Sequence, residues 1–303
     1  MGDFCICTDE ARLTIGLMNI DSHQHFWRYD PIREGWITDA MSGIRRDFLP
    51  EDLLPELSRN HIDGCIAVQT DQSEAETHFL LDLAAKHQQI TGVVDWVDLC
   101  AANLPERLRY FSQFEKLCGF RHIAQSEPDD RFLARKEVIA GIRRLQRFGF
   151  SYDILIYPRQ LPAAIELVQK LPEQRFVIDH MAKPSIRMGE ISEWAKQIRT
   201  IAESRNVFCK VSGMVTEADW KNWHVSDFRP YLDVVFEAFG PDRIMFGSDW
   251  PVCLVAASYD QVKKLVAQYV KHLPDEQQQK ILGSNAISFY GLKTFSHEPA
   301  ITR

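Results

Sequence analysis

The chain has 303 residues, of which 45% are hydrophobic and 25% are charged, and it carries a net charge of −7. This acidic balance argues against nucleic acid or an anionic membrane as the main partner. The seven cysteines fit no disulfide framework, which is typical of reduced thiols and predicts a cytoplasmic protein. No apolar run approaches the roughly 18 residues that a membrane-spanning helix requires.

The predicted elements alternate between short apolar runs and amphipathic stretches. The apolar runs predict eight strands, at residues 20–26, 64–69, 92–97, 119–124, 152–156, 176–180, 207–212 and 244–248. Helical spacing of apolar residues predicts helices at 73–88, 137–148, 192–202, 234–239 and 259–272. Strands that read as continuous apolar runs are typical of parallel sheets buried on both faces.

Eight strands that alternate with helices predict an α/β protein, a (β/α)8 TIM-like barrel. A doubly wound open sheet is the structural alternative, and it is disfavoured because no G-x-G-x-x-G follows the first strand. Residues 1–17 precede the first strand and lack the features of a signal peptide. We expect them to form an extension outside the core, with residues 18–303 as a single barrel domain.

Two histidines lie near the end of the first predicted strand, in Asp21-Ser22-His23-Gln24-His25. Alternate side chains of a strand share a face, so His23 and His25 point the same way. Two adjacent imidazoles can hold a divalent metal or polarise a carbonyl oxygen. A pair of buried histidines bonded to backbone is the plainer alternative.

Two further polar residues are predicted to close later strands. His180 follows Val177-Ile178-Asp179, and Asp249 follows Gly247-Ser248. Catalytic side chains of this fold lie at the carboxyl ends of barrel strands. His180 could instead be a core histidine and Asp249 a capping residue. The four residues together, at the ends of three strands, favour an active site.

This combination resembles the metal-dependent hydrolases of the amidohydrolase superfamily. The stretches IDSHQHFW, FVIDHMAKP, SGMVTEADW and SDWPVC are similar to its amidohydrolase 2 branch, whose members open small lactones. Further similar stretches extend the resemblance from about residue 20 to residue 292. Within the branch, the chain is most similar to the sugar-lactonases, which act on aldonolactones such as L-fucono- and L-rhamnono-lactone.

The resemblance implies a lactonase, a hydrolase of a carboxylic ester. Lactone hydrolysis needs an activated water, a polarised carbonyl and a proton for the leaving alkoxide. Asp249 is the expected base. His23, His25 and His180 are expected to bind the carbonyl oxygen or, with Asp249, a metal. Fourth-strand residues 119–125 contain no lysine to bridge two metals, so one zinc-like ion or none is expected, without an organic cofactor.

A second group of residues is expected to bind the hydroxyl groups of the substrate, because a polyol needs many donors, acceptors and aromatic faces. It comprises Arg121, His122, Gln125, Glu127, Tyr152, Asp153, Arg159, Lys183, Lys210, Ser212, Trp223 and Trp250. Each could instead have a surface, capping or core role, and we expect roughly half of them to miss the ligand. The expected partner is thus a small sugar lactone, bound by a monomer or a homo-oligomer.

Three competing functions remain open. Arg121 and Arg159 could clamp a carboxylate, as a metal-dependent decarboxylase of the same superfamily or a dicarboxylate-pyrone lactonase would require. The third is a non-catalytic sugar-binding barrel, which the four candidate catalytic residues disfavour.

Overall fold

The computed structural model describes residues 18–293. Its centre is an eight-stranded parallel sheet with the strands in chain order. The strands are β1 (Ile20–Gln24), β2 (Gly64–Val68), β3 (Ile90–Asp95), β4 (Leu117–His122), β5 (Ser151–Ile154), β6 (Phe176–Ile178), β7 (Val207–Val211) and β8 (Ile244–Phe246). The expectation for residues 1–17 lies outside the described residues.

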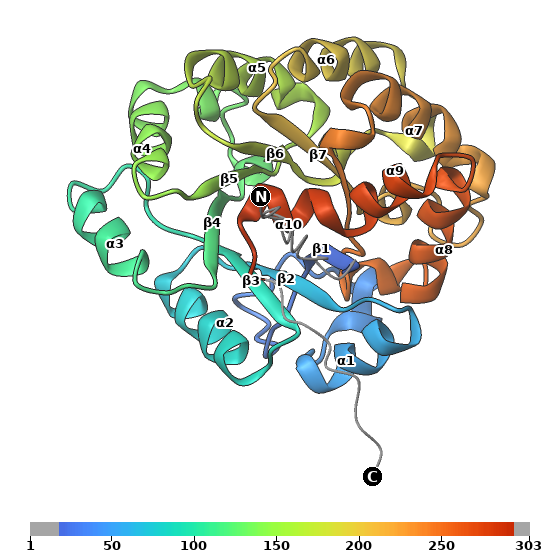
Figure 1. Cartoon of the computed structure of the whole chain (residues 1–303), viewed down its shortest axis with the longest axis horizontal. Coiled ribbons are helices and arrows are strands. Elements are labelled where there is room, and N and C mark those ends of the chain that lie inside the picture. The colour runs from blue at the N-terminus through green and yellow to red at the C-terminus, as the bar shows by residue number, and fades with distance from the viewer. Residues whose placement is uncertain (1–17, 294–303) are drawn as a thin grey trace, which may run out of the picture.

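The sheet closes on itself between its first and last strands. Gln24 forms a parallel bridge with Trp250, and the His25 amide donates to the Trp250 carbonyl at 2.7 Å. The hydroxyl of Ser22 donates to the carbonyl of Phe246 at 2.7 Å. These contacts join β1 to the chain at the end of β8, and the predicted barrel is confirmed (Figure 1).

Helices surround the strands in Figure 1. They are α1 (Pro50–Arg59), α2 (Glu74–Lys86), α3 (Leu104–Phe111), α4 (Lys136–Gln146), α5 (Leu161–Lys170), α6 (Ser192–Ala202), α7 (Val225–Phe239), α8 (Tyr259–Val270), α9 (Asp275–Gln279) and α10 (Asn285–Tyr290). The predicted helix at 192–202 coincides with α6. The one at 234–239 is only the end of α7, because Pro230 lies inside that helix and weakens its sequence signal.

All eight strands end one or two residues earlier than predicted, and at β6 and β8 this changes where site residues lie. β6 stops at Ile178 and β8 at Phe246, so His180 and Asp249 lie on the turns that follow rather than in the strands. The reason is backbone conformation, since both residues have positive φ, at 54° and 58°, which no strand accommodates.

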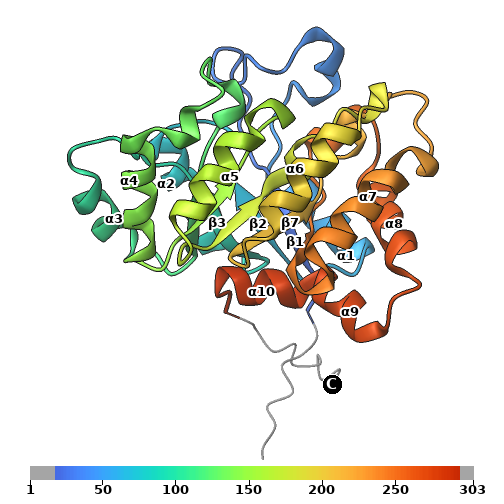
Figure 2. The same cartoon turned by 90° about the horizontal axis from the view of Figure 1, so that it is seen from above.

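The two ends of the barrel differ. Helix α10 covers the end where the strands begin, and the long segment between β1 and α1 rises at the opposite end (Figure 2). Inside the barrel near α10, apolar side chains such as Ile66, Val94 and Met245 pack against Phe289 and Tyr290 of that helix. The carboxyl ends of the strands therefore form the open mouth.

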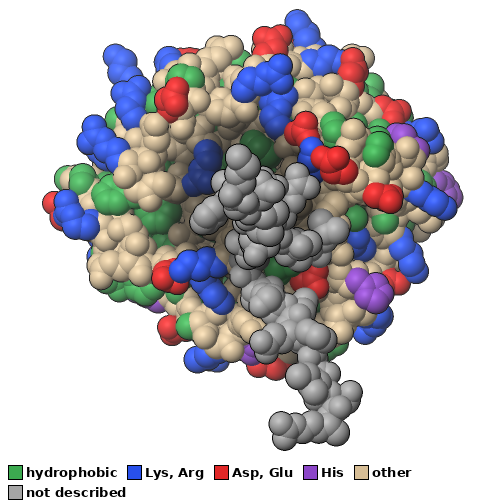
Figure 3. Space-filling view, viewed as in Figure 1, with side chains coloured by type: hydrophobic (Ala, Val, Ile, Leu, Met, Phe, Trp, Pro, Cys, Tyr) green, Lys and Arg blue, Asp and Glu red, His purple; other side chains and the backbone are tan. Residues whose placement is uncertain are grey.

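Charges of both signs are interspersed on the α10 face, as Figure 3 shows. The cations on this face are therefore not gathered into one patch, although the chain carries a net charge of −7. Within residues 18–293, no helix is both long enough and apolar enough to cross a bilayer.

Candidate active site

The four predicted catalytic residues meet at the mouth of the barrel. Nε2 of His25 lies 3.3 Å from Oδ1 of Asp249, and Nε2 of His180 lies 3.9 Å from the same oxygen. The ring of His23 lies 4.9 Å from that of His25 and 4.3 Å from that of His180, between centroids. All four are buried. The residues come from β1, the turn after β6 and the turn after β8, so only barrel closure brings them together.

Outer partners fix the orientation of two imidazoles. Nδ1 of His25 lies 2.8 Å from the carbonyl oxygen of Val68, which can only accept, so Nδ1 donates there and Nε2 faces Asp249. Nδ1 of His180 shares a 2.9 Å hydrogen bond with Oγ of Ser212. Partners of this kind set the ring tautomer in metal and acid–base sites.

His180 and Asp249, two of the four residues at the mouth, have left-handed backbone conformations. Residues 180–183 all have positive φ, as does Asp249, which is unusual for residues other than glycine. Gly213 packs against the ring of His180, and a Cβ there would lie only 2.5 Å from Nδ1 of that histidine. Clusters of such conformations are typical of functional sites, where the surrounding structure holds them in place.

A fully buried charge network lies around His23. Lys210 Nζ contacts Oδ2 of Asp153 at 2.6 Å, Oδ1 of Asp179 at 3.0 Å and Nδ1 of His23 at 3.2 Å. Arg121 donates from Nη1 to Oδ2 of Asp179 at 2.9 Å, and the same nitrogen lies 3.3 Å from Nε2 of His23. The cations and carboxylates thereby compensate one another out of water.

The hydrogen bonds of Asp153 and Arg121 extend this network. Tyr290 of α10 donates its hydroxyl to Oδ2 of Asp153 at 2.7 Å. Arg121 also donates from Nε to Oε1 of Gln69 at 2.8 Å. The network therefore runs from the mouth of the barrel to the helix that covers its other end.

Burial and charge set the protonation states in the cluster. Burial lowers the pKa of His180 to about 4 and holds the pKa of His23 well below its usual value. Burial alone would raise the pKa of Asp249, but His180, His25 and Lys183 outweigh it and hold that pKa below its ordinary value. The cluster therefore combines neutral imidazoles at His23 and His180 with an ionised carboxylate at neutral pH.

This donor set fits a single divalent cation. His23, His25 and Asp249 each offer one ligand atom, and these atoms lie within 4.8 Å of one another. Imidazole and carboxylate ligands are those that zinc-like ions take in catalytic sites. The bond from Nδ1 of His25 to a backbone carbonyl is the outer contact that such ligands usually make.

Some of the predicted substrate-binding residues lie near the cluster in other roles than expected. Arg121 and Lys210 are buried in the charge network rather than free in the mouth. Lys183 lies near the rim, with Nζ 3.7 Å from Oε1 of Glu217. His122 pairs with Glu127 at 2.7 Å and stacks on Phe132.

Other predicted residues are not brought to the cluster. Tyr152 is fully buried and its ring contacts Phe176, so it is part of the core. Arg159 is exposed and pairs with Asp130 at 2.7 Å. Trp223 donates from its indole nitrogen to the Ala256 carbonyl, and the ring of Trp250 packs on Phe48. The backbone amide of Gln125 donates to the Leu155 carbonyl, while its side-chain Oε1 has no partner among the described residues.

The sequence analysis missed three residues around the cluster: Gln69, Asp179 and Glu217. Asp179 had a usable signal, because a carboxylate inside an apolar run requires a buried cation, and Lys210 lies in another such run. Glu217 lies in one of the stretches similar to the family, but carries no signal of its own.

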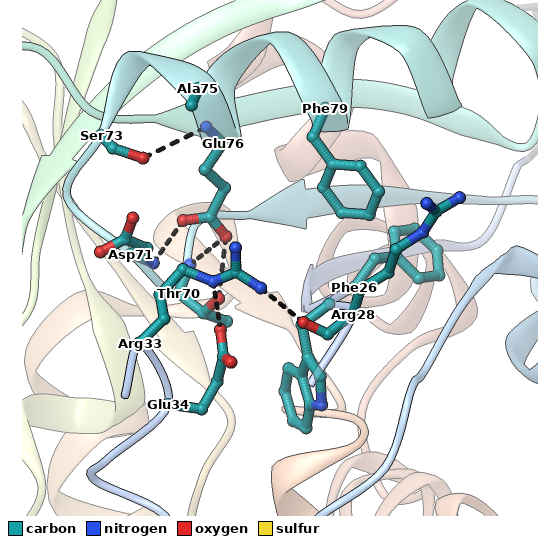
Figure 4. Close-up of a pocket in the computed structure, with 11 residues that line it drawn as sticks. Phe26, Arg28, Arg33, Glu34, Thr70, Asp71, Ser73, Ala75, Glu76 and Phe79 are labelled. Carbon is teal, nitrogen blue, oxygen red and sulfur yellow. Dashed lines mark hydrogen bonds and ion pairs between the residues drawn. The ribbon is translucent and has the colours of Figure 1, made fainter. Parts of the chain in front are cut away.

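A cavity of about 170 Å³ lies among residues that follow β1 and β2 (Figure 4). Glu76 extends toward Thr70 and Asp71 there, and accepts hydrogen bonds from both backbone amides. Arg33 pairs with Glu34 at 2.9 Å. None of the predicted site residues lines this cavity, and its Arg33, Glu34 and Glu76 side chains have partners within the chain.

Comparisons with known proteins agree with this geometry. The chain is 39% identical to an L-fucono-1,5-lactonase of Burkholderia multivorans, over 95% of this chain and 100% of that protein. It is 32% identical to an L-fucono-1,5-lactonase of Burkholderia ambifaria, over 89% of this chain and 94% of that protein. The solved structure of an amidohydrolase from Burkholderia multivorans with bound zinc superposes with a TM-score of 0.88 at 39% identity, over 91% of this chain and 100% of that one.

The model of the amidohydrolase family matches residues 20–292, which include all eight strands and the four residues of the cluster. This match covers far more than half of the chain, and the full-length relatives agree with it. The chain therefore belongs to the amidohydrolase family.

Proposed function

We propose that this protein is a sugar lactonase, which hydrolyses the ring ester of an aldonolactone such as L-fucono-1,5-lactone to the aldonic acid. The observation that carries the proposal is the similarity to an L-fucono-1,5-lactonase over the whole length of that protein. The His/Asp cluster at the mouth supports it, because it combines the groups that ester hydrolysis needs.

Asp249 acts as the general base. Its carboxylate is ionised at neutral pH and takes a proton from the water that attacks the lactone carbonyl. The same carboxyl then returns the proton to the ring oxygen as the ester bond breaks. His25 and His180, whose Nε2 atoms flank Asp249, orient the carboxylate and the reacting groups.

His23, His25, His180 and Asp249 are the residues that would hold a divalent cation. When bound, such an ion supplies Lewis acidity and lowers the pKa of a bound water. The buried network beneath His23 fixes that imidazole in place whether or not the ion is bound, because its contacts to Lys210 and Asp179 come from the chain itself.

The arginine clamp of the alternative functions has less support. Arg121 already binds Asp179 and Gln69, and Arg159 pairs with Asp130 on an exposed surface. Both guanidinium groups are therefore engaged by this chain, which favours a polyol substrate over a dicarboxylate or an aromatic acid.

The proposal is tested with a panel of aldonolactones and a pH indicator, with initial rates corrected for hydrolysis without enzyme. We expect ring opening of L-fucono-1,5-lactone or a close relative. Parallel assays after chelator treatment, and after adding zinc back, measure whether the cation is needed. A folded protein that opens none of the sugar lactones would overturn the proposal.

A further inference from the structure

Lys183 and Glu217 lie one layer further out than the His/Asp cluster. Their side chains are 17% and 21% exposed, whereas those of His180 and Asp249 are 4% and 6% exposed. The pair is therefore more open to solvent than the cluster, and a bound ligand can contact it.

The backbone of Lys183 is bonded to His180, and Glu217 follows a glycine that packs against the His180 ring. Lys183 ends the left-handed run that begins at His180, and its amide donates to the His180 carbonyl at 2.8 Å. Glu217 ends the short turn Val215–Glu217, just beyond Gly213, which packs against the His180 ring. Both side chains therefore project from backbone that lies beside His180.

Electrostatic coupling also places the pair near the base. Burial raises the pKa of Glu217, Lys183 opposes the rise and the charge of Asp249 adds to it. Lys183 in turn lowers the pKa of Asp249 and of His180. The charges of the pair and of Asp249 therefore act on one another.

The ion pair itself is loose. Nζ of Lys183 lies 3.7 Å from Oε1 of Glu217, which is longer than a hydrogen bond. The Lys183 ammonium is therefore able to donate a hydrogen bond to a ligand group beside the pair. The Glu217 carboxylate is able to accept a hydrogen bond from the same group. A hydroxyl is the group that does both at once.

We propose that Lys183 and Glu217 recognise the lactone hydroxyl on the ring carbon next to the reacting carbonyl, with Lys183 donating to it and Glu217 accepting from it. This inference rests on the proposed lactonase function. The carbonyl carbon has two ring neighbours, the ester oxygen and the adjacent carbon. The ester oxygen can only accept, so it would leave the Glu217 carboxylate unmatched, whereas the hydroxyl satisfies both side chains.

The test compares Glu217→Gln with wild type on two substrates, L-fucono-1,5-lactone and its analogue that lacks the hydroxyl next to the carbonyl. Removing a charged hydrogen-bond acceptor should lower kcat/KM on the hydroxylated lactone by about 10- to 100-fold. On the deoxy analogue the same variant should equal wild type, because the bond it removes is absent there. Lys183→Met should also lose more activity on the hydroxylated lactone than on the deoxy analogue, and any effect of the lost charge on Asp249 should be common to both substrates.

A matched control is Glu166→Gln, which removes the carboxylate of an exposed ion pair with Lys170 on α5 and should change neither rate. Equal loss on both substrates would overturn the inference, since Glu217 would then act on the chemistry or the fold. No loss on either substrate would also overturn it. A wild-type enzyme that opens no sugar lactone would instead refute the proposed function, so the two failures are distinct.

Discussion

At the residue scale, the site depends on a few side chains whose charge state is set by burial. His180, with a pKa of about 4, stays neutral across the physiological range, while Asp249 stays ionised. A neutral imidazole beside an anionic carboxylate is what general-base chemistry at neutral pH needs. Burial therefore widens the pH range in which His180 is neutral, and neighbouring groups keep Asp249 ionised.

Replacing the proposed base tests its role directly. Asp249→Asn should lower kcat by about 10²- to 10⁴-fold, the usual contribution of a general base. The fold should survive, because asparagine tolerates the left-handed conformation that residue 249 adopts at φ 58°. Lactone assays measure the loss, and thermal unfolding checks the fold. A variant that retains most of its turnover would remove Asp249 from the role of base.

At the element scale, the site is built on turns rather than on strands. β6 and β8 end before His180 and Asp249, and both turns continue in left-handed backbone. Gly213 lies beyond β7, with φ 61°, and leaves just enough room for the His180 ring. A residue just beyond β7 therefore sets the space available to His180, which lies just beyond the neighbouring strand β6.

Alanine variants of two glycines distinguish the effect of side-chain crowding from the effect of backbone strain. Gly213→Ala places a methyl group against His180, whereas Gly189, with φ 69°, has open space around it. Both alanine variants should lose roughly 1–2 kcal/mol of stability from the left-handed backbone.

Only Gly213→Ala should also lose activity. Displacing His180 should lower kcat on the order of 10²-fold, the cost of a misplacement of about 1 Å. Urea unfolding and lactone assays on both variants make the comparison. Equal activity in the two variants would show that the ring of His180 moves without consequence.

At the scale of the whole molecule, the two ends of the barrel are connected. Apolar side chains fill the interior near α10, and Tyr290 of that helix bonds to Asp153 of the charge network. The same network holds His23 at the mouth through Lys210. Helix α10, which covers the end where the strands begin, therefore also supplies a hydrogen bond to the buried carboxylate of Asp153.

Tyr290→Phe removes this link without changing the shape of the core. It should lower the free energy of unfolding by about 1–3 kcal/mol, because a buried acceptor loses a partner. Tyr269→Phe is the control, since that hydroxyl donates to Asp233 at an exposed position where water can replace it. Urea denaturation of both variants decides the point. A Tyr290 variant no less stable than the control would contradict a buried link.

The sequence by itself determined the barrel and the four central residues. Eight short, continuous apolar runs are typical of strands buried on both faces, and three of them carry a polar residue at or just beyond the carboxyl end. His23 and His25 share a face because side chains alternate along a strand, which is local geometry. Such features depend on near neighbours in the chain, so the pattern alone is enough.

Only the tertiary structure decided what the other polar residues contact. Lys210 and Arg121 proved to be buried partners of carboxylates, Tyr152 a core residue and Arg159 an exposed ion pair. Glu217 reached the rim through a turn that the sequence does not mark. These contacts join residues far apart in the chain. Barrel closure and left-handed turns, which no local pattern encodes, set which charges face one another.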